Sequence, residues 1–433
     1  MAYIFPADLA TEIRARWQSF AAHQAAPALP GEPALTHLLE TAFFASVERE
    51  EGRPLRFVLC CAPAGQVVDQ DDSRVTPVVP LHPARTLSVE SIRALAPAIS
   101  PYSAAMLVEV GGRADATITG LLHIGGHFSR ARSGRSFYHR PAPFALLIEV
   151  RDPGELHIYQ GGIKLAAMKA GHLQDQIAFS SLEFLPMTDI LARGVQALGP
   201  LVQPPRHEPP HESSDFEWTA LLGTILSVVN GIKEHGHGGT LLLAAPGAEG
   251  TLPVRLKHDV GGEVRVLGQQ FVRFLNARHA LADHRWALRL KVAPVPEASV
   301  GALLENTALA DEVELGDVVD LIARLSAVDG ALVLSSDLRL IGFGAEIVLD
   351  ASAPVTAYEA VGHWGLTGAR TPVDSLSFGM RHRSALRCVS LAESSAAFVV
   401  SQDGVVSVFW RLGQEVFVKR NVNTANPSMV GGW

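Results

Sequence analysis

Residues 318–334 read VVDLIARLSAVDGALVL, and the apolar pattern changes partway along this stretch. Its first half places apolar residues at the spacing of one helical face: Val318, Leu321, Ile322 and Leu325. After Asp329 and Gly330, residues 332–334 form a short apolar run typical of a buried strand. The stretch therefore predicts a helix followed directly by a strand. Asp329 stands at the junction, where a strand end can present a carboxylate to a crevice.

Outward from this stretch, the C-terminal half alternates helix and strand patterns. An apolar helical stripe runs from Phe216 to Ile232, and residues 240–245 form a short apolar strand. Residues 397–401 and 405–410 are two β-rich runs joined through Asp403-Gly404, a pair that favours a hairpin turn. This alternation is typical of an α/β layer structure.

The N-terminal half is richer in strand patterns. Helices are predicted at about 34–50 and at 89–96, the second capped by Ser88 and stopped by Pro97. Strands are predicted at 57–62, 105–110, 117–123, 144–150 and 156–159. An α+β module is the expected architecture. Prolines 204, 205, 209 and 210 predict a stiff linker at 203–214, with domains at 1–202 and 215–433.

Composition narrows the class of protein. The 433 residues are 48% hydrophobic and 18% charged, which allows large cores and argues against bulk disorder. A net charge of -8 argues against broad attraction to nucleic acid or to an anionic membrane. Cys60, Cys61 and Cys388 are too few for a disulfide framework. With no signal-peptide pattern and no long apolar span, the expected location is the cytoplasm.

A second candidate for chemistry is the run from Gly379 to Ala385, which opens a helix predicted to reach Leu391. The free N–H groups and positive dipole end of a helix N-terminus attract anions. Arg381 and Arg383 add guanidinium groups suited to phosphate oxygens. Each motif also has an ordinary structural interpretation. The run could be a solvated basic helix start, and Asp329-Gly330-Ala331 could be a plain turn.

The combination is more specific than either part. Asp-Gly-Ala at a strand start, a Gly-x-Arg-His-Arg-Ser-Ala helix, and an apolar strand ending in Ser401-Gln402 before a hairpin occur in this order. This arrangement resembles the diadenylate cyclase family over about residues 216–420. The resemblance implies a mixed sheet with helices on both faces, preceded by the α+β domain.

The resemblance also implies residue roles. Asp329 would be the metal-associated carboxylate near the attacking 3′-hydroxyl. Gly330 and Ala331 would contact ATP through the backbone, and Ile347 would be an apolar contact to the nucleotide. The triphosphate-binding run would comprise Gly379, Met380, Arg381, His382, Arg383 and Ser384. Ser401 would make a further contact near the phosphates or the metal.

The implied reaction condenses two ATP into cyclic di-AMP and two pyrophosphates, with Mg²⁺ or Mn²⁺ as the cofactor. Because each domain would hold one ATP, self-association of the C-terminal domain is implied. Two features depart from the family pattern. Met380 stands where threonine is usual, and the interval from Asp329 to Arg381 is long, with an extra segment around 362–372. A catalytically degenerate domain that binds ATP or a cyclic dinucleotide without turnover is therefore the alternative, and a scaffold that only resembles the family is a third.

The N-terminal half offers weaker candidates. His123 and His127 have the i, i+4 spacing of a metal pair, but Gly125-Gly126 between them favours a turn over a helix. His235 and His237 lie among glycines, where a solvated loop is the ordinary interpretation. The residues around Glu50–Phe57 and Leu121–Gly125 resemble a DACNV-type sensor module found ahead of diadenylate-cyclase-like domains. Such a module implies an N-terminal sensor whose ligand the sequence does not identify.

Overall fold

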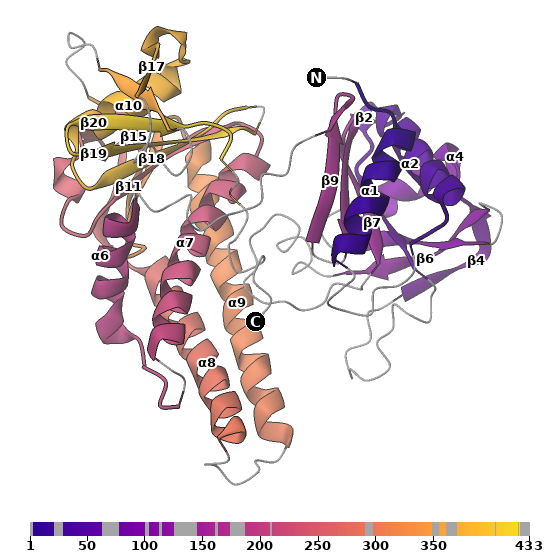
Figure 1. The fold of residues 1–433 in the computed structure, drawn as a ribbon, viewed down its shortest axis with the longest axis horizontal. Helices are drawn as coiled ribbons and strands as arrows, with labels where there is room; N and C mark the ends of the chain where they lie inside the picture. Colours follow the sequence, from indigo (N-terminus) through magenta and orange to yellow (C-terminus); the bar gives the residue numbers. More distant parts are fainter. Residues whose placement is uncertain are drawn as a thin grey trace. The chain divides into compact units, whose positions relative to one another are not determined.

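The structure is a computed structural model that describes residues 3–20, 29–62, 78–99, 104–111, 115–124, 145–160, 163–173, 187–207, 210–290, 298–348, 355–360, 370–402, 404–422 and 424. These residues form two compact units, 3–173 and 187–424. Each unit has its own sheet (Figure 1). Each also has its own hydrophobic core. The predicted fold class, an α/β chain with an α+β N-terminal part, is confirmed. Within the described ranges, no helix is both long and apolar enough to cross a membrane.

The first unit is a mixed sheet covered by helices. Its helices are α1 (Pro6–Phe20), α2 (Glu32–Val47) and α4 (Val89–Leu95). Its strands are β3 (Phe57–Cys61), β4 (Val78–Thr86), β5 (Ala104–Val110), β6 (Ala116–His123), β7 (Leu146–Asp152), β8 (Glu155–Gln160), β9 (Ile163–Lys169) and β10 (His172–Leu173). The sheet order is β10-β9-β8-β7-β3-β5-β6-β4, and a separate small hairpin joins β1 (Arg49–Glu50) to β2 (Arg53–Pro54). The cap predicted at Ser88 is present, because its side chain accepts a hydrogen bond from the backbone N–H of Ser91.

The second unit has its sheet between two layers of helices. The helices are α6 (Thr188–Leu198), α7 (Pro210–Glu234), α8 (Val266–Arg289), α9 (Ala298–Arg324) and α10 (Met380–Leu391). The strands are β11 (Gly239–Ala244), β12 (Val254–Arg255), β13 (His258–Val264), β14 (Ala331–Ser335), β15 (Leu340–Ile347), β16 (Ala357–Glu359), β17 (Thr371–Val373), β18 (Ser395–Val400), β19 (Val406–Leu412) and β20 (Glu415–Lys419). Their order is β12-β15-β14-β11-β18-β19-β20-β16-β17, with β13 also paired to β15.

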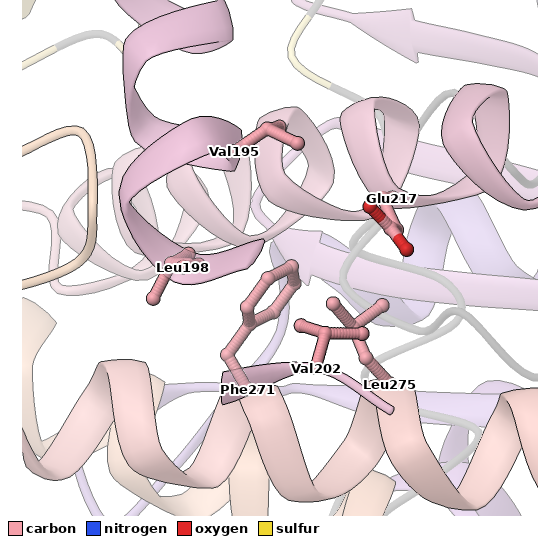
Figure 2. Close-up of a pocket in the computed structure, with 6 residues that line it drawn as sticks. All are labelled: Val195, Leu198, Val202, Glu217, Phe271 and Leu275. Carbon is pink, nitrogen blue, oxygen red and sulfur yellow. The ribbon is translucent and has the colours of Figure 1, made fainter. Parts of the chain in front are cut away.

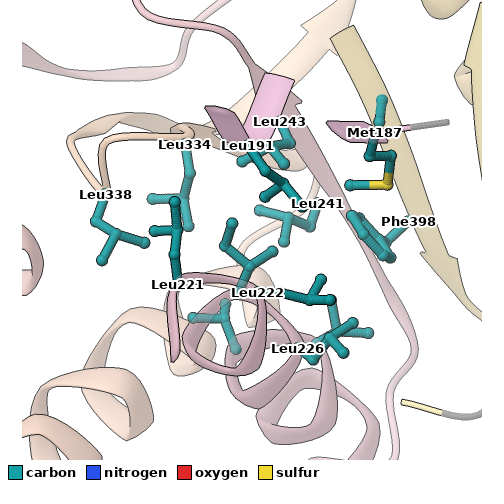
Figure 3. Packing of buried hydrophobic residues seen from close by; sticks show 14 of the residues in the cluster. Met187, Leu191, Leu221, Leu222, Leu226, Leu241, Leu243, Leu334, Leu338 and Phe398 are labelled. Atoms are coloured by element: carbon teal, nitrogen blue, oxygen red, sulfur yellow. The ribbon is translucent and has the colours of Figure 1, made fainter. Parts of the chain in front are cut away.

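Both faces of this sheet are buried. Alternate residues of the central strands point to opposite faces. Leu241, Leu243, Leu334 and Phe398 join the core beneath α6 to α9, where Figure 3 shows Leu221, Leu222 and Leu226 of α7 packed against them. The other face packs against α10 through a second cluster that includes Leu242, Val333, Ala397, Val399, Leu386 and Val389. Burial on both faces explains why β11 and β14 are continuous apolar runs rather than alternating ones.

The linker predicted at 203–214 is corrected by the structure. Helix α7 begins at Pro210, inside that range, and α6 lies before it in the second unit. Proline is tolerated in the first turn of a helix, so prolines there do not require a linker. Helix α6 is tightly docked: a Cβ added to Gly194 would lie 2.4 Å from the carbonyl oxygen of Ser336, whose hydroxyl donates to Ile190 O at 2.7 Å. The second unit therefore starts before residue 203.

A small hollow lies where α6, α7 and α8 meet. Its lining is apolar except for the carboxylate of Glu217, which Figure 2 shows directed from α7 toward the hollow. The other lining residues are Val195, Leu198, Val202, Phe271 and Leu275. None of the site residues predicted from the sequence lines it, so the candidate site lies elsewhere.

Candidate functional site

The sheet topology brings the predicted motifs to one edge of the sheet, the one at which β11 and β14 begin and β18 ends. Strand β14 runs parallel to β11, with Ala331 opposite Thr240, and β11 pairs antiparallel with β18, with Gly239 opposite Val400. The residues that precede β14 and β11 therefore meet the residues that follow β18. Asp329 and Ser401 belong to strands two positions apart, which corresponds to roughly 10 Å between them. Strand β15 ends at this same edge, because Ala345 lies opposite Ala331.

Asp329 lies at the start of this edge, after the short 3-10 turn Leu325–Ala327 that ends α9. Its side chain is exposed. Within the described residues, no hydrogen bond or ion pair holds its carboxylate, whereas its backbone carbonyl accepts a hydrogen bond from Lys257 Nζ at 3.2 Å. The carboxylate is therefore available to a ligand or a cation. The expected helix, Asp329 and strand occur in the order that the sequence predicts.

Gly330 cannot be replaced without strain. Its φ is +128°, and a Cβ built there would lie 2.4 Å from the backbone carbon of Gly344 on β15. A side chain is excluded both by this backbone conformation and by the close contact. The two glycines thus let the chain at Gly330 pass closely beside β15. Ala331 is buried in the sheet, so its contribution to a ligand would come from the backbone.

A charged group that the sequence analysis did not identify stands beside Asp329. Glu346 on β15 pairs with Arg255 Nη2 at 2.5 Å and with Lys257 Nζ at 3.3 Å. The hydrogen bond from Arg255 and then that from Lys257 lower the pKa of Glu346, so this carboxylate is ionised at neutral pH. Lys257 and Asp329 are 72 residues apart in the chain. They come together because β15 pairs with β14 on one side and with β12 and β13 on the other.

Arg381 reaches the same edge from the other layer. Helix α10 begins after Gly379, which has extended backbone angles and accepts the Arg383 N–H at 3.1 Å. The guanidinium of Arg381 donates to the carbonyl of His237 at 3.3 Å, in the loop before β11. A Cβ on Gly238, whose φ is +64°, would lie 2.7 Å from Arg381 Nη1 and 2.6 Å from Val400 O. Gly238 therefore allows Arg381 to lie against the ends of β11 and β18.

His382 and Arg383 do not accompany Arg381. The ring of His382 stacks on Phe378, meets Phe409 edge-on and lies 3.3 Å from Ser407 Oγ. It therefore packs between α10 and β19. Residues two apart on a helix do not face each other, so Arg381 and Arg383 diverge. His382 instead fixes α10 on the sheet.

The remaining predicted residues lie around this edge. Met380 is 76% exposed at the helix start, and Ser384 is partly buried one turn on. Ser401 forms the turn after β18, donating its N–H to Val405 O and accepting from the Gly404 N–H, each at 2.9 Å. Asp403, within the predicted hairpin turn, lies outside the described residues. Ile347 pairs with Val254 at the end of β15.

Part of the long interval between Asp329 and Arg381 is described. Residues 357–359 form β16, which pairs parallel with β20, and β17 pairs antiparallel with β16. The interval therefore extends the sheet beyond β20, while residues 361–369 are outside the described residues. His127 of the suggested metal pair is outside them as well. In the part of the chain that the structure describes, no three His, Cys, Asp or Glu side chains form a metal cluster.

Comparison with known proteins bears on the first unit. Residues 24–123 match the family described as Probable sensor domain DACNV. The matched stretch includes α2, α4 and strands β1 to β6, so the sensor assignment of the N-terminal half is supported over these residues. No curated protein matches the chain.

Proposed function

We propose that the second unit is a diadenylate cyclase, which condenses two ATP molecules into cyclic di-AMP, and that the first unit acts as its sensor. One observation carries the proposal: Asp329, Arg381 and Ser401 come from distant parts of the sequence to one edge of a single sheet. A free carboxylate beside a guanidinium and a glycine-lined backbone suits a metal-bound polyphosphate.

The charges at this edge suit a nucleotide. ATP brings nearly four negative charges, and phosphoryl transfer depends mainly on positioning and on charge neutralisation. Arg381, Lys257 and Arg255 supply positive charge, while Glu346 offsets part of it. Arg381 would hold phosphate oxygens. Gly330 and Gly238 would let the nucleotide approach the backbone closely.

A divalent cation fits the donor set present. Mg²⁺ is commonly held by one or two carboxylates together with substrate phosphates rather than by a cage of protein ligands. The exposed, unpaired carboxylate of Asp329 provides one such ligand within the described residues. When bound, Mg²⁺ or Mn²⁺ lowers the pKa of the attacking hydroxyl and offsets phosphate charge.

The reaction has a simple balance. The 3′-oxygen of one ATP forms a bond to the α-phosphorus of the other, the bond from that phosphorus to the β-phosphate bridging oxygen breaks, and pyrophosphate leaves. The hydroxyl proton passes to water. The second ATP reacts in the same way in return. Because one unit would bind one ATP, two chains must present their Asp329 edges to each other, and the specific rate should rise with protein concentration.

A catalytically degenerate nucleotide-binding regulator is the second candidate. Met380 has no hydroxyl to offer a phosphate, and its exposed side chain stands at the first turn of α10. Incubation of the full chain with ATP and Mg²⁺ or Mn²⁺, followed by mass spectrometry of the products, separates the candidates. Cyclic di-AMP supports the cyclase. ATP binding without product at high protein concentration supports the degenerate regulator.

A further inference from the structure

Lys257 is tied to the candidate site by two contacts. Its Nζ donates to the backbone carbonyl of Asp329 at 3.2 Å and lies 3.3 Å from Oε1 of Glu346. An ammonium group has three donors in all. Glu346 also pairs with Arg255, so the carboxylate beside Lys257 has a second cationic partner.

The path of the Lys257 side chain depends on a glycine, Gly344, on β15. Gly344 has a φ of +64°, and a Cβ built there would lie 3.2 Å from Lys257 Cβ and 3.4 Å from its Cδ. The first distance is closer than ordinary van der Waals contact. The glycine therefore allows the lysine stem to cross β15 with its ammonium at Asp329. Lysine stems commonly pack along apolar or backbone surface in this way.

The peptide between Asp329 and Gly330 needs such an anchor. Glycine has the largest conformational freedom of any residue, and Gly330 follows the carboxylate directly. The carbonyl of Asp329 precedes the first ladder residue, Ala331. Among described residues, the hydrogen bond that the structure gives this carbonyl comes from Lys257.

We propose that Lys257 is a positioning residue: its ammonium fixes the Asp329-Gly330 peptide and thereby the direction in which Asp329 presents its carboxylate. The catalytic part of this inference rests on the proposed function, but the structural part does not. Lys257 is 42% exposed, so its replacement removes a contact without opening a core.

Hydrogen exchange of the full chain, measured by mass spectrometry on peptides spanning 326–334, tests the structural part. Lys257→Met should speed exchange of the hydrogen-bonded amides that flank the released peptide, among them Val328, whose N–H donates to Leu325 O, by about threefold or more. Lys257→Arg, which keeps a donor, should restore much of the protection. Lys169→Met is the matched control, because Lys169 is 46% exposed and pairs with a carboxylate, Glu155, but belongs to the first unit. Equal exchange in wild type and Lys257→Met overturns the inference.

Steady-state kinetics test the catalytic part. Lys257→Met should lower kcat by about tenfold while KM for ATP stays within about threefold, since a misdirected carboxylate affects the reacting geometry more than binding. Lys257→Arg should recover part of kcat. An increase in KM alone would contradict positioning and indicate a direct phosphate contact. An inactive wild type refutes the proposed cyclase, and the exchange measurement still decides the role of Lys257.

Discussion

At the residue scale, the candidate site depends on glycines where chain segments cross. Gly330 lies on Gly344, and Gly238 leaves room for Arg381. At each position the glycine leaves space that a side chain would fill, and this space lets a charged group lie at the sheet edge. The site is therefore sensitive to small substitutions that leave its charges intact.

Gly330→Ala should destabilise the second unit by about 2 kcal/mol or more, because a φ of +128° and the contact with Gly344 both penalise a Cβ. Urea unfolding of the full chain measures the change. Gly250→Ala is the matched control, since nothing lies within 4 Å of a Cβ there, and it should change stability by no more than about 0.5 kcal/mol. Similar losses of stability in the two variants would show that the contact between Gly330 and Gly344 is not tight.

Arg381→Ala should weaken ATP binding by about tenfold or more, because a charge-assisted hydrogen bond to phosphate contributes about 1.5–3 kcal/mol. Calorimetric titration of the full chain with a non-hydrolysable ATP analogue and Mg²⁺ measures the affinity. Arg387→Ala, two turns from the start of the same helix, should bind like wild type. An unchanged affinity in Arg381→Ala would remove the phosphate role assigned to Arg381.

At the element scale, three side chains of α8 hold the segment that leads into α7. Asn276 accepts the Gln203 N–H, His279 Nδ1 lies 3.2 Å from the Gln203 carbonyl, and Asp283 accepts the N–H groups of Arg206 and His207. His279 is 3% exposed, and its Nε2 is 3.7 Å from Glu217 Oε1. This part of the predicted stiff linker is bound along a helix.

This clamp gives a pH dependence. Burial lowers the pKa of His279, with neighbouring Arg278 acting in the same direction and the Gln203 carbonyl opposing it. Below the ordinary histidine pKa of 6.5, the unfolded state therefore binds more protons at this position than the folded state. The stability that neutral His279 contributes is fully present above pH 6.5 and is lost as pH falls toward the pKa of His279 in the folded protein. Burial raises the pKa of Glu217 above its ordinary value of 4.5. This shift has the opposite effect, because it makes the folded protein less stable as pH rises above 4.5.

His279→Gln removes the first effect and leaves the second. The stability advantage of wild type over this variant should therefore shrink between pH 7.5 and pH 5.5, as followed by urea unfolding at each pH. Glu217→Gln, measured in parallel, isolates the opposing carboxylate. An advantage that grows on acidification would mean that His279 is charged in the folded protein.

Elements with local sequence signals are predicted correctly, whereas contacts between distant parts of the chain are not. The hairpin around Gly404, the strand after Asp329 and the helix after Gly379 have local signals, and the structure contains all three. The sequence pattern predicts neither α8 nor α9 before Val318, because their partial exposure weakens the apolar stripe. Lys257 could not be predicted, since its proximity to Asp329 is set by strand pairing 72 residues away in sequence. The contacts of His382 could not be predicted, since sequence spacing does not show that the rings of Phe378 and Phe409 lie against it.

At the scale of the whole molecule, the two units have separate cores. Leu38 is fully buried in the first and Leu241 in the second. Calorimetry of the full chain should therefore give two unfolding transitions. Leu38→Ala should lower the temperature of one transition and Leu241→Ala that of the other. Each substitution should reduce the free energy of unfolding of its own unit by about 2–5 kcal/mol. A single transition that both substitutions lower equally would show that the units unfold as one.

The central claim is that the Asp329 edge forms cyclic di-AMP. The most direct measurement is mass spectrometry of products from the full chain incubated with ATP and Mg²⁺ or Mn²⁺, at several protein concentrations, beside Asp329→Ala and the distant control Asp189→Ala. We predict cyclic di-AMP and pyrophosphate from wild type and Asp189→Ala, at a specific rate that rises with concentration, and none from Asp329→Ala. Absence of the cyclic product from wild type under every metal and concentration, or its undiminished formation by Asp329→Ala, would contradict the claim.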